Sequence, residues 1–286
     1  MRPLLVATDF SANAKHAAEY GYHLAVQLKT NLILCNAFIV PAEVPQAGLM
    51  TWPVDEYQEI NKESAEELSM LKDILQKSDQ DFGFKPVINY VNETGELTSV
   101  VNELVGHEDV QLIIMGTHGN NGLSTFLLGN HSRKMIDEAK CPLLLIPASA
   151  PVAPIKMIAF ATDFKHIEKD LENIYKLIEL ARPLNAELLI THINFQNWPD
   201  QELRDTLEQL LVDISNKADF PKIYYRIVKS DQPEKGLDWL CDHGQVDMLA
   251  MVHRKHNLIE KILTGSHTQK MAAHINIPLL VIPENY

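Results

Sequence analysis

Three glycines follow one apolar run at a spacing that suits a phosphate-binding loop. Gly116 and Gly119 come directly after the run Gln111–Met115, and Gly129 stands where a helix over Asn130–Ala139 is expected to begin. Glycine lets the backbone turn sharply and approach a ligand closely. The unpaired N–H groups at a helix start attract anions. Glycines after a strand are a weak signal by themselves, because many loops use them only to turn.

An aspartate follows the first apolar run of the chain. Asp9 comes directly after Pro3–Thr8, at the carboxyl end of a strand, which is the edge where open α/β sheets bind ligands. It could accept hydrogen bonds from ribose hydroxyls or hold a magnesium ion beside a triphosphate. Alternatively, it caps the next helix through the turn Asp-Phe-Ser. For Asp163, which has the same sequence context, we favour the cap.

The residues around the expected helix start offer other polar groups. The Ser132 hydroxyl could donate to phosphate or form an ordinary N-terminal hydrogen bond within the helix; the preceding glycines favour phosphate. His131 and His267 are interpreted as structural or interface residues. His253 and His256 supply only two nitrogen ligands without a cysteine pair, so we expect no metal site. No nucleophile and base pattern predicts a catalytic site.

Composition restricts the class of protein and partner. The chain has 286 residues, 46% of them hydrophobic, which suits two globular domains. A formal charge of −13 would repel DNA or RNA, so nucleic acid is not expected as a partner. The first apolar run, Leu4–Ala7, is too short for a signal peptide, and no run is long enough to cross a membrane. Cys35, Cys141 and Cys241 form neither a disulfide framework nor a zinc spacing. We therefore expect a soluble cytoplasmic protein.

Apolar runs alternate with helical patterns along the chain, which indicates a parallel, doubly wound α/β sheet. Ile39–Trp52, which is rich in proline, is expected to form a long loop. In the first half the expected strands are Pro3–Thr8, Asn31–Phe38, Lys85–Val91, Gln111–Met115 and Pro142–Pro147, and the expected helices run to Leu28 and over Val54–Ser78, Glu96–Gly106 and Asn130–Ala139.

The second half repeats the first. After a linker at Ala148–Pro154, the tripeptide Thr-Asp-Phe returns, and Phe126–Met135 and Ile262–Met271 match without a gap. We therefore expect two domains, a first repeat at residues 1–150 and a second at 151–286. Strands of the second repeat are expected at Lys156–Thr162, Ala186–Asn194, Lys222–Val228 and Val246–Val252, with a last one in Ile277–Pro283.

The glycines of the loop are not repeated. At the same register the positions of Gly116, Gly119 and Gly122 hold Val252, Lys255 and Leu258. Side chains at these positions would crowd the space in which glycine lets a phosphate approach the main chain. The first repeat is therefore expected to be the better ligand site.

In this context the spacing Gly116-x2-Gly119-x9-Gly129 resembles that of the nucleotide-binding members of the universal stress protein family. Asn130 departs from the family pattern, which has Ser or Thr after the third glycine. The resemblance covers nearly the whole chain as two copies. It implies two Rossmann-like domains of the adenine nucleotide alpha hydrolase-like type, each a five-stranded parallel sheet flanked by helices. Some members of the family bind ATP and others bind no nucleotide.

The same resemblance implies a set of site residues and a pseudo-dimer. ATP, with Mg²⁺, would bind only the first repeat. Leu143–Ile146 and Leu279–Ile282 would pair the repeats as an intramolecular pseudo-dimer, and a homodimer of the tandem chain stays an open alternative. Asp9 would lie near the ribose and phosphates, Asn36, Phe38 and Val40 beside adenine, and Gly116, Gly119, Gly129, Asn130, His131 and Ser132 around the phosphates.

Three functions are compatible with these residues. The first is a stress-response regulator, in which ATP changes the order of the Ile39–Trp52 loop and so alters a surface for an unknown protein partner. The second is a nucleotide-free scaffold, because Asn130 and the altered second repeat could leave both sites empty. The third is a slow ATPase.

Overall fold

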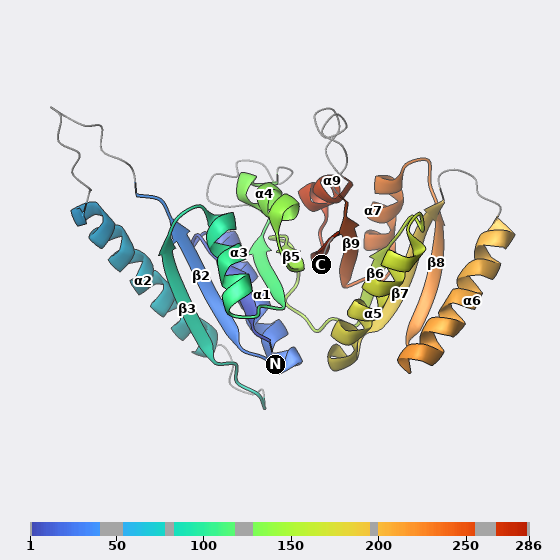
Figure 1. Ribbon diagram of the computed structural model, residues 1–286, viewed down its shortest axis with the longest axis horizontal. Helices are drawn as coiled ribbons and strands as arrows, with labels where there is room; N and C mark the ends of the chain where they lie inside the picture. The colour runs from blue at the N-terminus through green and yellow to red at the C-terminus, as the bar shows by residue number, and fades with distance from the viewer. Residues whose placement is uncertain are drawn as a thin grey trace.

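The computed structural model describes residues 2–40, 54–77, 83–117, 128–194, 200–254 and 267–284. Its strands form one ten-stranded sheet in the order β3-β2-β1-β4-β5-β10-β9-β6-β7-β8 (Figure 1). The five strands of each repeat are parallel to one another. The sequence therefore predicted the α/β class and the parallel pairing within each repeat correctly.

The first repeat places its elements close to the expected ranges. β3 differs most, because it continues three residues beyond the predicted end at Val91, through polar residues that hydrophobicity alone does not mark as a strand. The elements are β1 (Leu4–Ala7), α1 (Ala12–Leu28), β2 (Leu32–Phe38), α2 (Val54–Lys77), β3 (Ile88–Thr94), α3 (Leu97–His107), β4 (Leu112–Gly116), α4 (Asn130–Glu138) and β5 (Leu143–Ile146).

The second repeat has the same order with a shorter second helix. The segment that joins its second strand to that helix is also shorter, residues 195–199 against 39–53. The elements are β6 (Met157–Ala161), α5 (Ile167–Leu184), β7 (Glu187–Asn194), α6 (Asp200–Ala218), β8 (Ile223–Lys229), α7 (Pro233–His243), β9 (Met248–His253), α9 (His267–His274) and β10 (Leu279–Pro283). Most of the loop predicted at Ile39–Trp52 lies outside the described residues.

Two apolar layers cover the sheet. Helices α1, α2, α5 and α6 pack on one face, and α3, α4, α7 and α9 pack on the other. Strands buried on both faces explain the continuous apolar runs in the sequence. No helix in the described ranges is both long and apolar enough to cross a membrane.

The two repeats meet edge to edge at the centre of the sheet. β10 pairs antiparallel with β5, with Leu279 opposite Leu145 and Val281 opposite Leu143, as the expected pairing of Leu143–Ile146 with Leu279–Ile282 requires. All four residues are buried. Because β5 and β10 would otherwise be exposed sheet edges, this pairing joins the two repeats into one sheet.

Candidate functional site

The first repeat fixes Asp9 in a tight turn between β1 and α1. The amide of Phe10 donates to the Thr8 hydroxyl at 3.0 Å, and the amide of Ser11 donates to the Asp9 carboxylate at 3.1 Å. Ser11 then caps α1, because its hydroxyl accepts from the amide of Ala14 at 3.1 Å. Phe10 has a φ of 63°, a left-handed conformation that is costly for a bulky residue. Asp9 therefore orders the turn, while Ser11 performs the capping.

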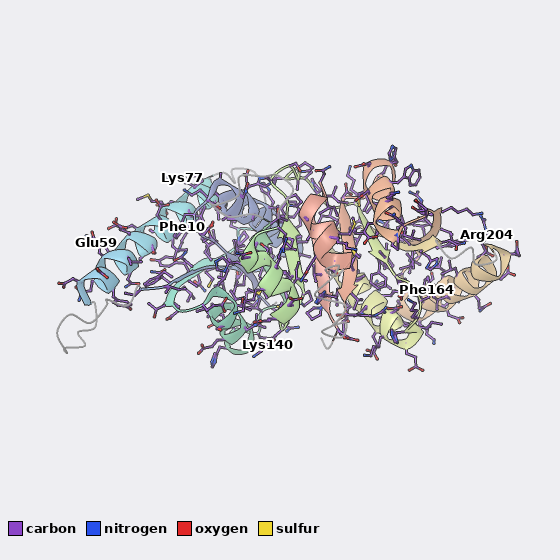
Figure 2. The ribbon with its side chains drawn as sticks, turned by 90° about the horizontal axis from the view of Figure 1, so that it is seen from above. Phe10, Glu59, Lys77, Lys140, Phe164 and Arg204 are labelled. Carbon is purple, nitrogen blue, oxygen red and sulfur yellow. The ribbon has the colours of Figure 1, made fainter. Side chains whose placement is uncertain are left out.

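The second repeat builds the same turn from the same tripeptide. Phe164, with a φ of 55°, donates its amide to the Thr162 hydroxyl at 3.0 Å. The amide of Lys165 donates to the Asp163 carboxylate at 3.2 Å. Figure 2 shows Phe10 and Phe164 in the two halves of the molecule. The duplication inferred from the sequence thus extends to individual hydrogen bonds, and in neither repeat does the aspartate cap the helix directly.

The end of β4 lies against the start of α1. A Cβ atom added to Gly116 would come within 3.1 Å of the Asn13 carbonyl oxygen. This approach is tighter than ordinary van der Waals contact, so Gly116 is needed for helix packing whether or not a ligand binds. The contact brings the β4 end beside the helix that follows the Asp9 turn.

The start of α4 is bound to the same strand end. The Ser132 hydroxyl is buried and lies within 3.1 Å of the Gly116 carbonyl and 3.2 Å of the Thr117 carbonyl. The amide of Gly129 donates to the Thr117 carbonyl at 3.0 Å. For Ser132 to donate to a phosphate, it would have to give up these carbonyl partners.

The other residues expected around the phosphates stand at the first turn of α4. Gly129 is the N-cap, with φ −62° and ψ 152° and no side-chain cap hydrogen bond. Asn130 and His131 are exposed. The first N–H groups of a helix have no acceptor within it, so this terminus suits an anion. Gly119 lies outside the described residues.

The residues expected beside adenine stand at the carboxyl end of β2. Asn36 is buried, and its side-chain amide donates to the Thr8 carbonyl at 2.8 Å. Phe38 is half-buried, with its ring 6.0 Å from that of Tyr57 on α2. Val40 is also half-buried. Asn36 therefore joins the β2 end directly to the residue before Asp9.

A guanidinium group holds the corresponding edge of the second repeat. Arg254, which follows β9, donates to Asp163 at 2.8 Å and to Asp170 on α5 at 2.8 Å. Thr162 donates its hydroxyl to the other oxygen of Asp170 at 2.7 Å. The Asp163 carboxylate, equivalent to Asp9, is therefore already paired with a permanent cation.

The surroundings of the two carboxylates shift their pKa values in opposite directions. Burial raises the pKa of Asp170, and its hydrogen bond from Thr162 and the charge of Arg254 only partly offset this effect. Burial also raises the pKa of the more exposed Asp163, but the hydrogen bonds and charge of Arg254 and Lys165 outweigh it and lower that pKa. Arg254 therefore keeps the Asp163 carboxylate ionised, and it offsets part of the pKa rise that burial causes at Asp170.

Sequence reasoning did not identify Arg254 or Asp170 as site residues. They lie 84 residues apart in the sequence, and only the fold brings the end of β9 next to α5. A lone Arg after an apolar strand is the sole local signal. Among the described residues, no group of three or more His, Cys, Asp or Glu is placed to hold a metal ion.

Comparisons with known proteins agree with this architecture. The family model described as "Universal stress protein family" matches residues 1–147 and again 156–283. A curated relative, the universal stress protein E homolog of Haemophilus influenzae, is 30% identical over 155 residues, which is 52% of this chain and 48% of that protein. The match thus spans about half the length of this relative.

Solved structures share the fold over the whole chain. A universal stress protein from Archaeoglobus fulgidus superposes with a TM-score of 0.70 at 17% identity, covering 99% of this chain and 98% of that one. A putative universal stress protein from Pseudomonas aeruginosa gives a TM-score of 0.59 at 13% identity, covering 99% and 93%. Because the family model matches both repeats, the chain belongs to the universal stress protein family as a tandem member.

Proposed function

We propose that this protein is a stress-response regulator that binds ATP, with Mg²⁺, in its first repeat and changes its interaction with a protein partner accordingly. The observation that carries the proposal is the convergence of three features at one sheet edge. These are the Asp9 turn, the β4 end at Gly116 and the N-terminus of α4. Hydrogen bonds and close packing join the three features.

Several groups at this edge suit parts of a nucleotide. The α4 N-terminus presents N–H groups to phosphates, and the Asp9 carboxylate suits ribose hydroxyls or a magnesium ion. Phe38 and Tyr57 offer aromatic rings near the β2 end. The crevice beyond the carboxyl ends of the strands is where open α/β sheets bind ligands.

Restriction to the first repeat is supported by Arg254. In the second repeat its guanidinium is hydrogen-bonded to both Asp163 and Asp170. In addition, Val252 stands at the position of Gly116, the glycine that ends β4. A nucleotide would have to displace an ion pair that includes a buried carboxylate, which costs free energy.

Calorimetric titration of the full chain with Mg-ATP tests the proposal. We expect binding in the wild type and loss of binding in Gly119→Val, because a side chain there would exclude the phosphates from the loop. Gly83→Val is the matched control, because a Cβ atom at Gly83 would meet no atom within 4 Å. No binding at millimolar Mg-ATP would refute the proposal.

The nucleotide-free scaffold is the second candidate, and a specific observation favours it. The Ser132 hydroxyl is held by two backbone carbonyls, and Asn130 stands where the family pattern has a hydroxyl. Adenine nucleotide retained through purification would exclude the scaffold. The proposal includes no turnover, so steady phosphate release that disappears in Asp9→Asn would instead indicate an ATPase.

A further inference from the structure

Three asparagines from three elements meet beneath α2 in the first repeat. Asn36 on β2 lies directly opposite Asn92 on β3 in the strand register. The Asn92 amide donates to the Asn61 carbonyl at 3.0 Å and to the Asn61 side-chain oxygen at 2.8 Å. Because paired residues of neighbouring strands project to the same face, the Asn36 and Asn92 side chains both lie on the side covered by α2.

Two acceptor atoms in this cluster lack a donor. The side-chain oxygens of Asn36 and Asn92 are buried, and neither accepts a hydrogen bond from any residue that the structure describes. Exchanging the Asn36 oxygen and nitrogen would not solve this, because the nitrogen is needed to donate to the Thr8 carbonyl. A buried acceptor without a donor destabilises a fold.

The fold itself does not require these amides. In the second repeat the paired positions hold His192 and Ile227. His192 makes a contact equivalent to that of Asn36 with Thr8, because its Nδ1 atom lies 3.1 Å from the Thr162 carbonyl. The other position is apolar. The pair of unsatisfied oxygens is therefore specific to the repeat that carries the glycine loop.

We propose that Asn36 and Asn92 form a specificity subsite for the exocyclic amino group of a nucleobase. An amino group on a purine carries two N–H donors, and two acceptors on neighbouring strands, about 4.8 Å apart at the backbone, can receive both. Phe38 follows Asn36 on the same face of β2, and Tyr57 precedes Asn61 on α2. Both rings are half-buried and lie 6.0 Å apart. A base stacked on them would lie on the same side of β2 as the amide oxygens. This inference rests on the nucleotide binding proposed above.

Titration of the full chain with Mg-ATP and with the inosine analogue Mg-ITP, which carries an oxo group in place of the amino group, tests the subsite. We expect the wild type to prefer ATP by about tenfold or more, because a site that offers acceptors rejects a ligand that lacks the donors. Asn92→Ile, which introduces the residue of the second repeat, should remove this preference, and a cooperative thermal transition of the variant checks that it is folded. Asn89→Ile, at an exposed position of the same strand, should keep the preference.

The outcomes separate this inference from the proposed function. Equal affinity of the wild type for both nucleotides would overturn the subsite and leave nucleotide binding intact. A wild-type preference retained in Asn92→Ile would also overturn it, because another group would then recognise the amino group. No binding of either nucleotide would overturn both proposals.

Discussion

At the scale of residues, the second repeat pairs the carboxylate after its first strand with a guanidinium group. The second repeat uses Arg254 to join Asp163 to the buried Asp170. At the gapless register the first repeat has His118 at this position, which lies outside the described residues. Duplication preserved the turn, while the residue at the sequence position of Arg254 diverged.

Replacing Arg254 with Met should destabilise the protein by about 2–4 kcal/mol, because it leaves the buried Asp170 without its cation. We place the value below the upper limit for buried pairs because the Asp163 side chain is 37% exposed. Chemical denaturation measures the change. Arg204→Met, at an exposed arginine on α6, is the control.

A second substitution checks that the lost charge is the cause. Adding Asp170→Asn to the Arg254→Met variant should recover part of the lost stability, because the buried carboxylate that lost its cation is then also removed. If the double variant is as unstable as the sum of both single variants, the ion pair does not explain the effect.

At the scale of elements, α4 is held in place by contacts on more than one side. Lys134 pairs with Glu96 at 3.1 Å, and the Asn102 side chain on α3 donates to the Glu138 carbonyl at 2.9 Å. At its N-terminus, Ser132 bonds the end of β4. These contacts fix the helix start that the proposed function uses for phosphates.

Glu96 should make this arrangement sensitive to acid. Burial alone would raise the pKa of the Glu96 carboxyl, but hydrogen bonds from Lys134 and the first turn of α3 lower it from 4.5 to about 2. A carboxyl whose folded pKa is lowered stabilises the protein above its unfolded pKa, and this contribution is lost as pH falls from 4.5 towards 2. Thermal unfolding of Glu96→Gln should show a smaller loss of stability across that window than the wild type.

The control for this prediction is Glu103→Gln, at an exposed position of α3. This variant should lose stability with falling pH in the same way as the wild type. An identical pH dependence in Glu96→Gln and the wild type would contradict the prediction.

The sequence predicted these elements well and their side-chain contacts poorly. Buried parallel strands and amphipathic helices leave a periodic pattern, so the end of α1 and the range of β2 were predicted to within one residue. The partners of Arg254 lie 91 and 84 residues away, and no local pattern records such a contact. Similarly, the Asn36 and Asn92 pair depends on strand register, which single residues do not reveal.

At the scale of the whole molecule, the two repeats are joined by side-chain contacts as well as by the pairing of β5 with β10. Asp137 on α4 accepts from Gln269 on α9 at 3.1 Å and lies 3.1 Å from the Nε2 atom of the buried His253. Figure 1 shows α4 and α9 next to each other where the two halves of the molecule meet. His253 directly precedes Arg254, so the contact between the repeats adjoins the ion pair of the second repeat.

Asp137→Ala should weaken the contact between the repeats by about 1–2 kcal/mol, through the loss of two polar contacts. The thermal midpoint should fall by roughly 2–6 °C for a chain of this size. Differential scanning calorimetry measures the shift. Glu138→Ala, next to it on the exposed side of α4, should change the midpoint less; an equal shift in both would assign the effect to the helix rather than to the contact.

The central claim is that one repeat of the pair binds nucleotide and the other does not. Native mass spectrometry of the full chain, equilibrated with Mg-ATP at increasing concentration, tests it most directly. We expect the mass to increase by one nucleotide per chain and to stop there, because in the second repeat Arg254 holds Asp163, the carboxylate equivalent to Asp9. Two bound nucleotides per chain, or none at saturating concentration, would contradict the account.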